Sequence, residues 1–200
     1  MSVRQQQKDL TRSRIIEAAL EVFDRDGYAT ARVEDVAAGA GVSRATFYLH
    51  FRSKIDVVTA MGDPLRRDSQ ALYRELDALA EPTWPALRAW LEVAVDFWWR
   101  HGRAVNIINQ ALASEPELTP QFVDAVRLSV DVMTNHLARW SGAEREAAHL
   151  RAMLFILQFE RFSFVWIVRG TPYDTEAVLD ALADSLWTAL HPGAVPRVPR

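Results

Sequence analysis

The sequence predicts an all-α protein of about nine helices. Apolar residues recur at helical spacing along most of the 200-residue chain. No stretch alternates apolar and polar residues between turn residues, as a half-buried strand would. Half of the residues are hydrophobic and 24% are charged, a balance that can bury a large core. The length suits one large domain, or a small domain followed by a larger one.

The first helix is expected from about Thr11 to about Asp26, where Gly27 ends it. Its apolar face comprises Ile15, Ala19, Val22 and Phe23. Residues 1–10 precede this helix and carry basic side chains, so they are expected to form a flexible basic arm.

Two short helices and a tight turn follow. The second helix is expected over about Arg32 to Ala40, and the third begins after Ser43, whose hydroxyl can cap it. Gly41 can adopt the left-handed conformation that a tight turn between helices requires. Inward-facing side chains are Val33, Val36, Ala37, Ala40, Phe47 and Phe51. The pattern predicts a helix–turn–helix domain over residues 11–56.

The remaining helices follow from apolar spacing and from breaks at glycine and proline. A fourth helix begins at Arg52-Ser53-Lys54 and is expected to be interrupted at Gly62-Asp63-Pro64, as a hinge or as a static kink. The later helices are expected over about Trp84–Arg100, Arg103–Ser114, a stretch between Pro120 and Ser141-Gly142, Ala143–Arg169 and Asp174–Leu190. Residues 57–191 then form a second domain, and residues 192–200 a disordered tail.

Charge is divided unevenly along the chain. The net charge is −3, yet residues 1–54 hold nine Lys/Arg against seven Asp/Glu, whereas the rest hold 14 against 19. This division suits a DNA-facing head on an acidic body. The absence of cysteine excludes disulfides, thiolate zinc sites and cysteine nucleophiles. No apolar run reaches membrane-spanning length and no signal peptide is visible, so a cytoplasmic location is expected.

The outward face of the third helix offers groups that can read DNA. Arg44 can donate to guanine, and Ala45 is small enough to approach base edges or a thymine methyl. The side chains that can hold phosphates are Thr46, Tyr48, His50 and Lys54. For an isolated pattern of this kind, two helices packed without a DNA-binding role are the alternative.

Three segments, 14–28, 33–51 and Ser53-Lys54, resemble the TetR/AcrR family of bacterial transcriptional regulators. The resemblance covers about the first third of the chain and combines apolar spacing, turn glycine, recognition helix and following lysine. It implies major-groove contacts from the third helix and a phosphate contact from Lys54. The expected DNA-binding residues are Arg32, Ser43, Arg44, Ala45, Thr46, Tyr48, Leu49, His50 and Lys54.

One position departs from the family pattern. The family usually has threonine where this chain has Ala31, at the start of the second helix. That hydroxyl caps the helix and can touch a phosphate. Thr30 is the expected substitute cap, and Arg32 is the expected substitute for the phosphate contact.

The larger domain is rich in aromatic residues, and the resemblance implies that it binds an effector and forms the dimer. Apolar walls with a few polar anchors are typical of small-molecule pockets. The candidate ligand-binding residues are Trp90, Phe97, Trp98, Asn106, Asn109, Gln110, Met133, Trp140, Phe155, Gln158, Phe159 and Phe162. A filled aromatic core is the alternative interpretation of the same residues. A small hydrophobic effector is expected, with no cofactor and no metal.

The stretch from Leu154 to Trp187 is similar to actinobacterial regulators of the ethionamide-resistance type, which accept long hydrophobic ligands. Where those regulators place polar amides, this chain has Ile156 and Phe159, so the ligand's identity does not carry over. Glu160 and Arg161 stand within this apolar stretch. They are expected to pair with other charges, the alternative being an anchor for a ligand's polar end.

The combined interpretation is a homodimeric repressor that a small hydrophobic ligand releases from a palindromic operator. The last two helices are expected to form the dimer interface. The alternatives are an activator or an effector-independent DNA-binding protein, and, as a distant third, an enzyme that uses the aromatic cavity. His101, His136, His149 and His191 show no spacing typical of metal ligands and no nucleophile–base pairing, so the chain is not expected to be an enzyme.

Overall fold

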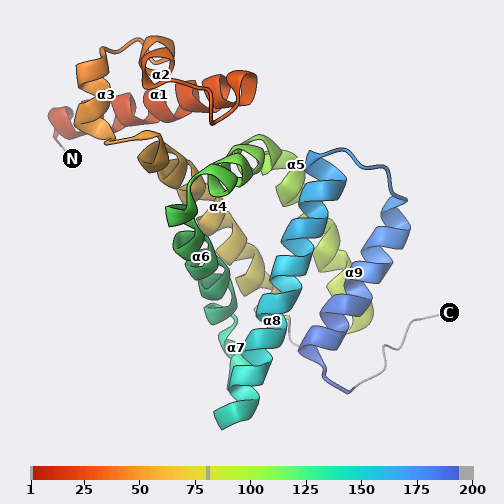
Figure 1. The fold of residues 1–200 in the computed structure, drawn as a ribbon. Coiled ribbons are helices and arrows are strands. Elements are labelled where there is room, and N and C mark those ends of the chain that lie inside the picture. The colour runs from red at the N-terminus through yellow and green to blue at the C-terminus, as the bar shows by residue number, and fades with distance from the viewer. Residues whose placement is uncertain (1, 80–81, 194–200) are drawn as a thin grey trace. The chain divides into compact units, whose positions relative to one another are not determined.

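The computed structural model describes residues 2–79 and 82–193, and over these residues the chain is helical without a strand (Figure 1). This confirms the predicted all-α fold. The α-helices are α1 (Val3–Asp26), α2 (Val33–Gly39), α3 (Arg44–His50), α4 (Lys54–Asp77), α5 (Trp84–Ser114), α6 (Thr119–Asp131), α7 (Thr134–Ala138), α8 (Gly142–Ser163) and α9 (Thr175–Leu190). A 3-10 turn (Pro116–Leu118) precedes α6, and a π-helical segment (Phe164–Val168) follows α8. None of the described helices is long and apolar enough to cross a membrane.

The chain divides into two compact units. The first unit contains residues up to 65 together with 103–121, and the second contains 66–102 together with the residues from 122 onward. Helices α4 and α5 each contribute residues to both units. The predicted division at residue 56 therefore differs from the observed one, because the second half of α5 belongs with the N-terminal helices.

Helix α1 begins at Val3, so residues 3–10, expected to form a flexible arm, are its first two turns. The hydroxyl of Ser2 caps the helix by accepting a hydrogen bond from the backbone N–H of Gln5, at 3.3 Å. The Gln5 side chain donates in turn to Asp9, one turn later, at 2.8 Å. The first contact satisfies a backbone N–H that would otherwise be free at the helix start, and the second joins side chains one turn apart on the helix surface. Residues 194–200, expected as part of a disordered tail, lie outside the described residues.

Helix α4 runs through Pro64 without a break, so the predicted interruption at residues 62–64 is wrong. Proline removes one backbone hydrogen bond and usually ends or kinks a helix. Here both flanks of Pro64 are buried in packed cores: Val57 and Met61 lie in the first unit, and Tyr73 and Leu76 in the second. Packing of this extent outweighs one missing hydrogen bond.

Helix α5 is also continuous, whereas two helices with a boundary near residues 101–102 were predicted. Glycine within a helix costs only about 1 kcal/mol relative to alanine, and the buried side chains on either side of Gly102 hold the helix together. Conversely, the single helix predicted before Ser141 is broken at residues 132–133, between α6 and α7. The long predicted helix over residues 143–169 changes to π-helical geometry after Ser163.

The core of the first unit joins α1, α2 and α3 to the second half of α5. Ile107 and Ala111 of α5 are fully buried in it, as are Phe23 and Tyr28. The backbone N–H of Tyr28 donates to the side-chain oxygen of Gln110 at 2.9 Å, and its hydroxyl donates to Glu115 at 3.1 Å. Burial and the nearby Glu115 carboxylate raise the pKa of Tyr28 well above its usual value. The phenol therefore stays protonated and can keep donating.

The core of the second unit is aromatic. Phe155 and Phe159 of α8 stack with ring centroids 6.0 Å apart, and Trp98 of α5 meets Phe159 edge-on at 6.2 Å. Helices α8 and α9 lie side by side (Figure 1). The carboxylate of Asp174 caps α9 by accepting from the N–H of Ala177 at 2.8 Å. The predicted last helix, from about residue 174 to 190, is confirmed.

Candidate nucleic-acid interface

Helix α3 is held by its two phenylalanines and presents its other side to solvent. Phe47 and Phe51 are buried, as predicted, and Phe47 packs at 6.0 Å from Phe51. Ser43 caps the helix, because its hydroxyl accepts from the N–H of Thr46 at 3.0 Å. The exposed side chains of this segment are Ser43, Arg44, Ala45, Tyr48 and Leu49, with Thr46 and His50 half-buried. Leu49 is 78% exposed, which leaves an apolar side chain free to meet a partner.

The turn before α3 is fixed by backbone contacts and by α1. Gly41 has φ of +64°, the left-handed conformation predicted for it. The N–H of Val42 donates to the carbonyl of Ala37 at 3.0 Å. The guanidinium of Arg14, on α1, donates to the carbonyl of Ala40 at 2.6 Å. The angle at which α3 leaves the turn is therefore set by three helices together.

Replacing Gly41 with alanine is expected to lower the free energy of unfolding by about 2 kcal/mol. A side chain in the left-handed region costs about 1 kcal/mol by itself. In addition, the new Cβ would lie 2.8 Å from Nη2 of Arg14, so that guanidinium would have to leave the Ala40 carbonyl. The measurement is urea denaturation of the variant beside Gly142→Ala. Gly142 also has positive φ, at +52°, but its Cβ would meet nothing within 4 Å.

The control isolates the contact with Arg14. Gly142→Ala introduces only the backbone strain. The free energy of unfolding should therefore fall by about 1 kcal/mol more in Gly41→Ala than in Gly142→Ala. Equal losses in the two variants would show that Arg14 adjusts without cost and that α1 does not hold the turn.

Arg44 is paired within the protein in the absence of DNA. Its Nη1 lies 3.1 Å from the carboxylate of Glu34 on α2, and its guanidinium lies 5.6 Å from the centroid of the Tyr48 ring. Both partners of the ion pair are more than half exposed, so the pair contributes at most about 1 kcal/mol. A guanine or a phosphate could therefore replace Glu34 at little cost.

The end of α3 is held by Arg12 of α1. Its guanidinium donates to the carbonyl of His50 at 3.3 Å and lies 4.2 Å above the ring of Phe51. Burial lowers the pKa of His50, and the charges of Lys8 and Arg12 lower it further, which favours the neutral imidazole. The positioning roles of Arg12 and Arg14 were not foreseen. The sequence showed them only as part of the positive charge at the start of the chain.

The start of α2 differs from the expectation. Arg32 occupies the capping position, is exposed, and makes no side-chain cap. The hydroxyl of Thr30, the expected substitute cap, instead donates to the carbonyl of Asp26 at the end of α1. Thr30 thus bonds to the end of α1. It lies two residues before the N-cap of α2, too far for its hydroxyl to accept from the backbone N–H groups of α2.

Lys54, the expected phosphate contact, is turned toward the protein. Its ammonium donates to the carbonyls of Tyr28 at 2.7 Å and of Ala31 at 3.0 Å, and it lies 4.6 Å from the centroid of the Tyr28 ring. Burial lowers the pKa of Lys54. The ammonium therefore ties the start of α4 to the loop before α2. A phosphate contact would have to share or replace one of these carbonyls.

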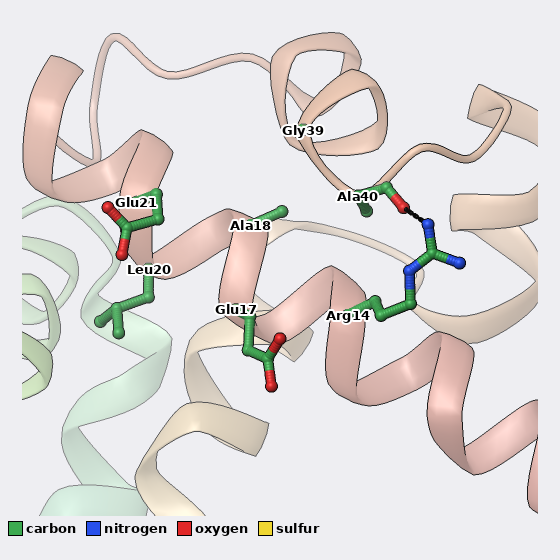
Figure 2. Close-up of a pocket in the computed structure, with 7 residues that line it drawn as sticks. All are labelled: Arg14, Glu17, Ala18, Leu20, Glu21, Gly39 and Ala40. Carbon is green, nitrogen blue, oxygen red and sulfur yellow. Dashed lines mark hydrogen bonds between the residues drawn. The ribbon is translucent and has the colours of Figure 1, made fainter.

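An open cleft runs along α1 beside the end of α2 (Figure 2). It is lined by Arg14, Glu17, Ala18, Leu20, Glu21, Gly39 and Ala40. Figure 2 shows Arg14 reaching the carbonyl of Ala40, whereas the carboxylate of Glu17 points away from it. The carboxylates of Glu17 and Glu21 at this cleft would repel the phosphates of a nucleic acid. We therefore do not assign the cleft to the nucleic-acid interface.

The candidate ligand-binding residues are divided between the two units. Asn106, Asn109 and Gln110 lie in the first unit, and the other candidates lie in the second. Gln110 serves the core of its own unit by accepting from Tyr28, and the side chain of Asn109 donates to its own helix at Val105, at 3.0 Å.

In the second unit, ring contacts join four of the apolar candidates, namely Phe97, Trp98, Phe155 and Phe159. The apolar candidates that are buried are Trp90, Phe97, Trp98, Met133, Phe155 and Phe159, while Trp140 and Phe162 are half-buried. Gln158 is exposed and its side-chain oxygen accepts from the hydroxyl of Ser185 at 3.0 Å. It therefore lies on the α8–α9 surface and not among the aromatic rings.

Glu160 has no charged partner, so the expected ion pair is not found. Its Oε2 is buried without a hydrogen-bond partner among the described residues, although the residue as a whole is half-buried. Burial raises the pKa of Glu160 to about 7. Arg161 is exposed and lies 5.4 Å from the ring of Phe164. Glu160 and Arg161, being adjacent on a helix, point in different directions.

Residues 15–61 match the family model of the bacterial regulatory proteins of the tetR family. Over almost the whole chain the sequence is similar to the HTH-type transcriptional activator FasR of Mycolicibacterium smegmatis. The two are 25% identical over 92% of this chain and 84% of FasR. A shorter similarity, at 30% identity, covers 52% of this chain and 48% of the transcriptional regulator EthR of the same organism.

The fold is similar to solved structures. One is the FadR repressor of Thermus thermophilus, solved with lauroyl-CoA, which superimposes with a TM-score of 0.60 over 94% of this chain and 98% of FadR. The two are 20% identical, so the similarity concerns the fold.

Proposed function

Because this chain is a DNA-binding transcriptional regulator of the TetR family, we propose that it is a dimeric repressor that a small hydrophobic ligand releases from a palindromic operator. The single observation that carries the proposal is the face of α3. Its apolar side is anchored by Phe47 and Phe51, while its other side leaves Arg44, Tyr48 and Leu49 exposed. A helix presented in this way fits the major groove of DNA.

In the proposed complex, Arg44, Ala45 and Leu49 meet base edges in the groove. Phosphates are held by the residues around them, namely Arg32, Ser43, Thr46, Tyr48, His50 and Lys54. Contacts to the bases and contacts to the phosphates have different expected effects. Base contacts select the DNA sequence, whereas phosphate contacts set the affinity and the register on the DNA.

Dimerisation is proposed through α8 and α9. Leu150 and Leu154, one turn apart on α8, are 55% and 57% exposed. On α9, Ala177 and Ala181 are exposed and also one turn apart, which allows close approach of a second helix. Two copies related by a two-fold axis would place their α3 helices about 34–36 Å apart, which matches successive major grooves. The operator is therefore expected to be palindromic.

The ligand is proposed to enter among the aromatic residues of the second unit, where Trp90, Phe97, Phe155 and Phe159 supply apolar surface. FadR of Thermus thermophilus, of similar fold, was solved with lauroyl-CoA, which favours an elongated acyl ligand as the first to test. Ligand and DNA would favour different conformations, so each would weaken the binding of the other.

Activation is the second candidate, favoured by the name of FasR, a transcriptional activator. Both candidates are tested by a gel shift with the promoter region next to the gene and by a reporter driven from that promoter. Repression requires lower reporter output with the protein present, and recovery when lauroyl-CoA dissociates the complex. Output that rises with the protein would establish activation instead, and the absence of specific binding would contradict both.

Replacing Arg44 with alanine is expected to weaken specific DNA binding by about 10- to 100-fold, because a bidentate contact to guanine contributes about 1–3 kcal/mol. Fluorescence anisotropy with the operator measures the affinity. Glu34→Gln is the matched variant, since it removes the carboxylate that pairs with Arg44 at 3.1 Å and leaves Arg44 free. It should keep or raise the affinity. Equal affinity of Arg44→Ala and the wild type would remove Arg44 from the proposed interface.

A further inference from the structure

Within the second unit, α7, the first half of α8 and the end of α9 enclose hydrogen-bond donors that meet no acceptor among the described residues. His136 on α7 is 5% exposed, and neither of its ring nitrogens has a hydrogen-bond partner there. The Nε1–H of Trp140 and the Nε–H of Arg151 are also buried and without a partner. An unpaired buried donor destabilises the fold, so an external acceptor would be favourable here.

Positive charge gathers at the same place. The guanidinium carbons of Arg139 and Arg151 lie 6.0 and 5.6 Å from the centroid of the Trp140 ring. Burial, together with the charges of Arg139 and Arg151, lowers the pKa of His136 to about 4, although the carboxylate of Asp77 opposes this effect. His136 is therefore neutral at pH 7 and has one N–H to donate.

The carboxylate nearest to His136 is already engaged. Asp77, at the end of α4, accepts from the backbone N–H groups of Asn135 and His136, at 2.8 and 2.7 Å. Over residues 2–79 and 82–193, neither Arg139 nor Arg151 forms a salt bridge. Arg139 instead donates to the carbonyl of Leu190, at 3.1 Å, which holds the end of α9 against this group. Neither guanidinium is thus paired with a carboxylate of the described residues.

We propose that this end of the second unit, the α7–α8–α9 end, binds the anionic group of a small molecule, a carboxylate or a phosphate. Arg151 and Trp140 would donate to its oxygens from Nε and Nε1, and Arg139 would balance its charge. His136 would add one N–H from the enclosed side. Charged acceptors form the strongest hydrogen bonds of this kind, and arginine suits both groups. Binding here does not require that the chain also respond to a hydrophobic effector.

The test is a titration of the full chain with inorganic phosphate and, separately, with sodium acetate, at constant ionic strength set with sodium chloride. Calorimetry measures the affinity, and the indole N–H signals in a nitrogen-15 correlation spectrum report contact with Trp140. Trp140→Phe identifies that signal by its absence. We expect one anion to bind at a single site and to shift the Trp140 indole signal. The preferred anion identifies the charged group of the ligand.

Substitutions locate the site. Arg151→Gln should weaken the binding by about 10-fold, and Trp140→Phe, which keeps a ring and removes the N–H, by about 5-fold. Arg127→Gln is the control, because it removes the same charge from an exposed arginine on α6. Equal affinities of Arg151→Gln and Arg127→Gln would overturn the proposal, as would a titration of both anions that leaves the Trp140 signal unmoved. Circular dichroism before titration ensures that only folded variants are compared.

One acidic side chain, that of Glu81, lies outside the described residues and must be tested as an occupant. Glu81→Gln should leave the anion affinity unchanged if the ligand is external. An affinity that rises by about 10-fold in this variant would mean that the chain's own carboxylate fills the site, and the proposal would fail.

Discussion

Replacing Glu160 with glutamine is expected to raise the free energy of unfolding at pH 8 by about 2–3 kcal/mol, with little change at pH 5. Oε2 of Glu160 is buried without a hydrogen-bond partner among the described residues, and burial raises the pKa of the carboxyl group from the usual 4.5 to about 7. Ionisation is therefore costlier in the folded chain than in the unfolded chain. The neutral carboxyl of Glu160 therefore contributes to the free energy of unfolding in full below pH 4.5, and this contribution is lost as the pH rises through 7.

The measurement is urea denaturation of wild type and variant at several pH values between 5 and 8. The difference between the two chains should grow with pH, because glutamine does not titrate. Glu146→Gln, at an exposed position on the same helix, serves as the control and should show no such growth. A constant difference for Glu160→Gln across the range would mean that the carboxylate finds a partner or water when ionised.

Replacing Lys54 with methionine is expected to destabilise the first unit by about 2 kcal/mol. The ammonium of Lys54 holds the carbonyls of Tyr28 and Ala31, and the variant leaves both without this donor while it keeps the stem. Lys8→Met is the control for stability, since Lys8 is exposed on α1. Both are compared by thermal unfolding. An unchanged unfolding temperature for Lys54→Met would show that the three contacts of the ammonium are replaced by water without cost.

The same variant distinguishes the two roles of Lys54. A phosphate contact contributes about 0.9 to the slope of log affinity against log salt concentration. If Lys54 acts by holding the loop before α2, the variant should bind DNA more weakly with an unchanged slope. A slope that falls by about 0.9 in Lys54→Met would establish the phosphate contact that the family resemblance implies.

The helix–turn–helix could be predicted because its signals are local. The turn needs Gly41, the cap needs Ser43, and the spacing of Phe47 and Phe51 fixes which face is buried, all within eleven residues. The helix boundaries were predicted wrongly where packing against residues distant in the sequence determines whether a helix continues. Pro64 and Gly102 are sound local reasons to end a helix, but residues from other helices bury the chain on both sides of each.

The polar residues of the larger domain were less predictable for a related reason. Helical spacing puts Glu160 and Arg161 inside an apolar stretch, but whether a charge meets a partner depends on the other helices that pack there. Likewise, Gln110 looked like a polar group for a ligand, and only the tertiary structure shows that it accepts from Tyr28. The aromatic residues were predicted to line a ligand pocket, with a filled core as the alternative. Most of them are buried, as their residue type predicts, and this burial is compatible with both interpretations.

The part of α5 that belongs to the first unit has a consequence for how the chain folds. Ile107 and Ala111 close the core around Phe23 and Tyr28, yet they follow the helix–turn–helix by more than fifty residues. During synthesis, α1, α2 and α3 emerge first. The apolar residues that pack against α5 stay exposed to solvent until residues 103–121 have left the ribosome. The unit that reads DNA is thus completed only after a stretch of the second unit has been made, and a fragment that ends at residue 65 would lack one wall of its own core.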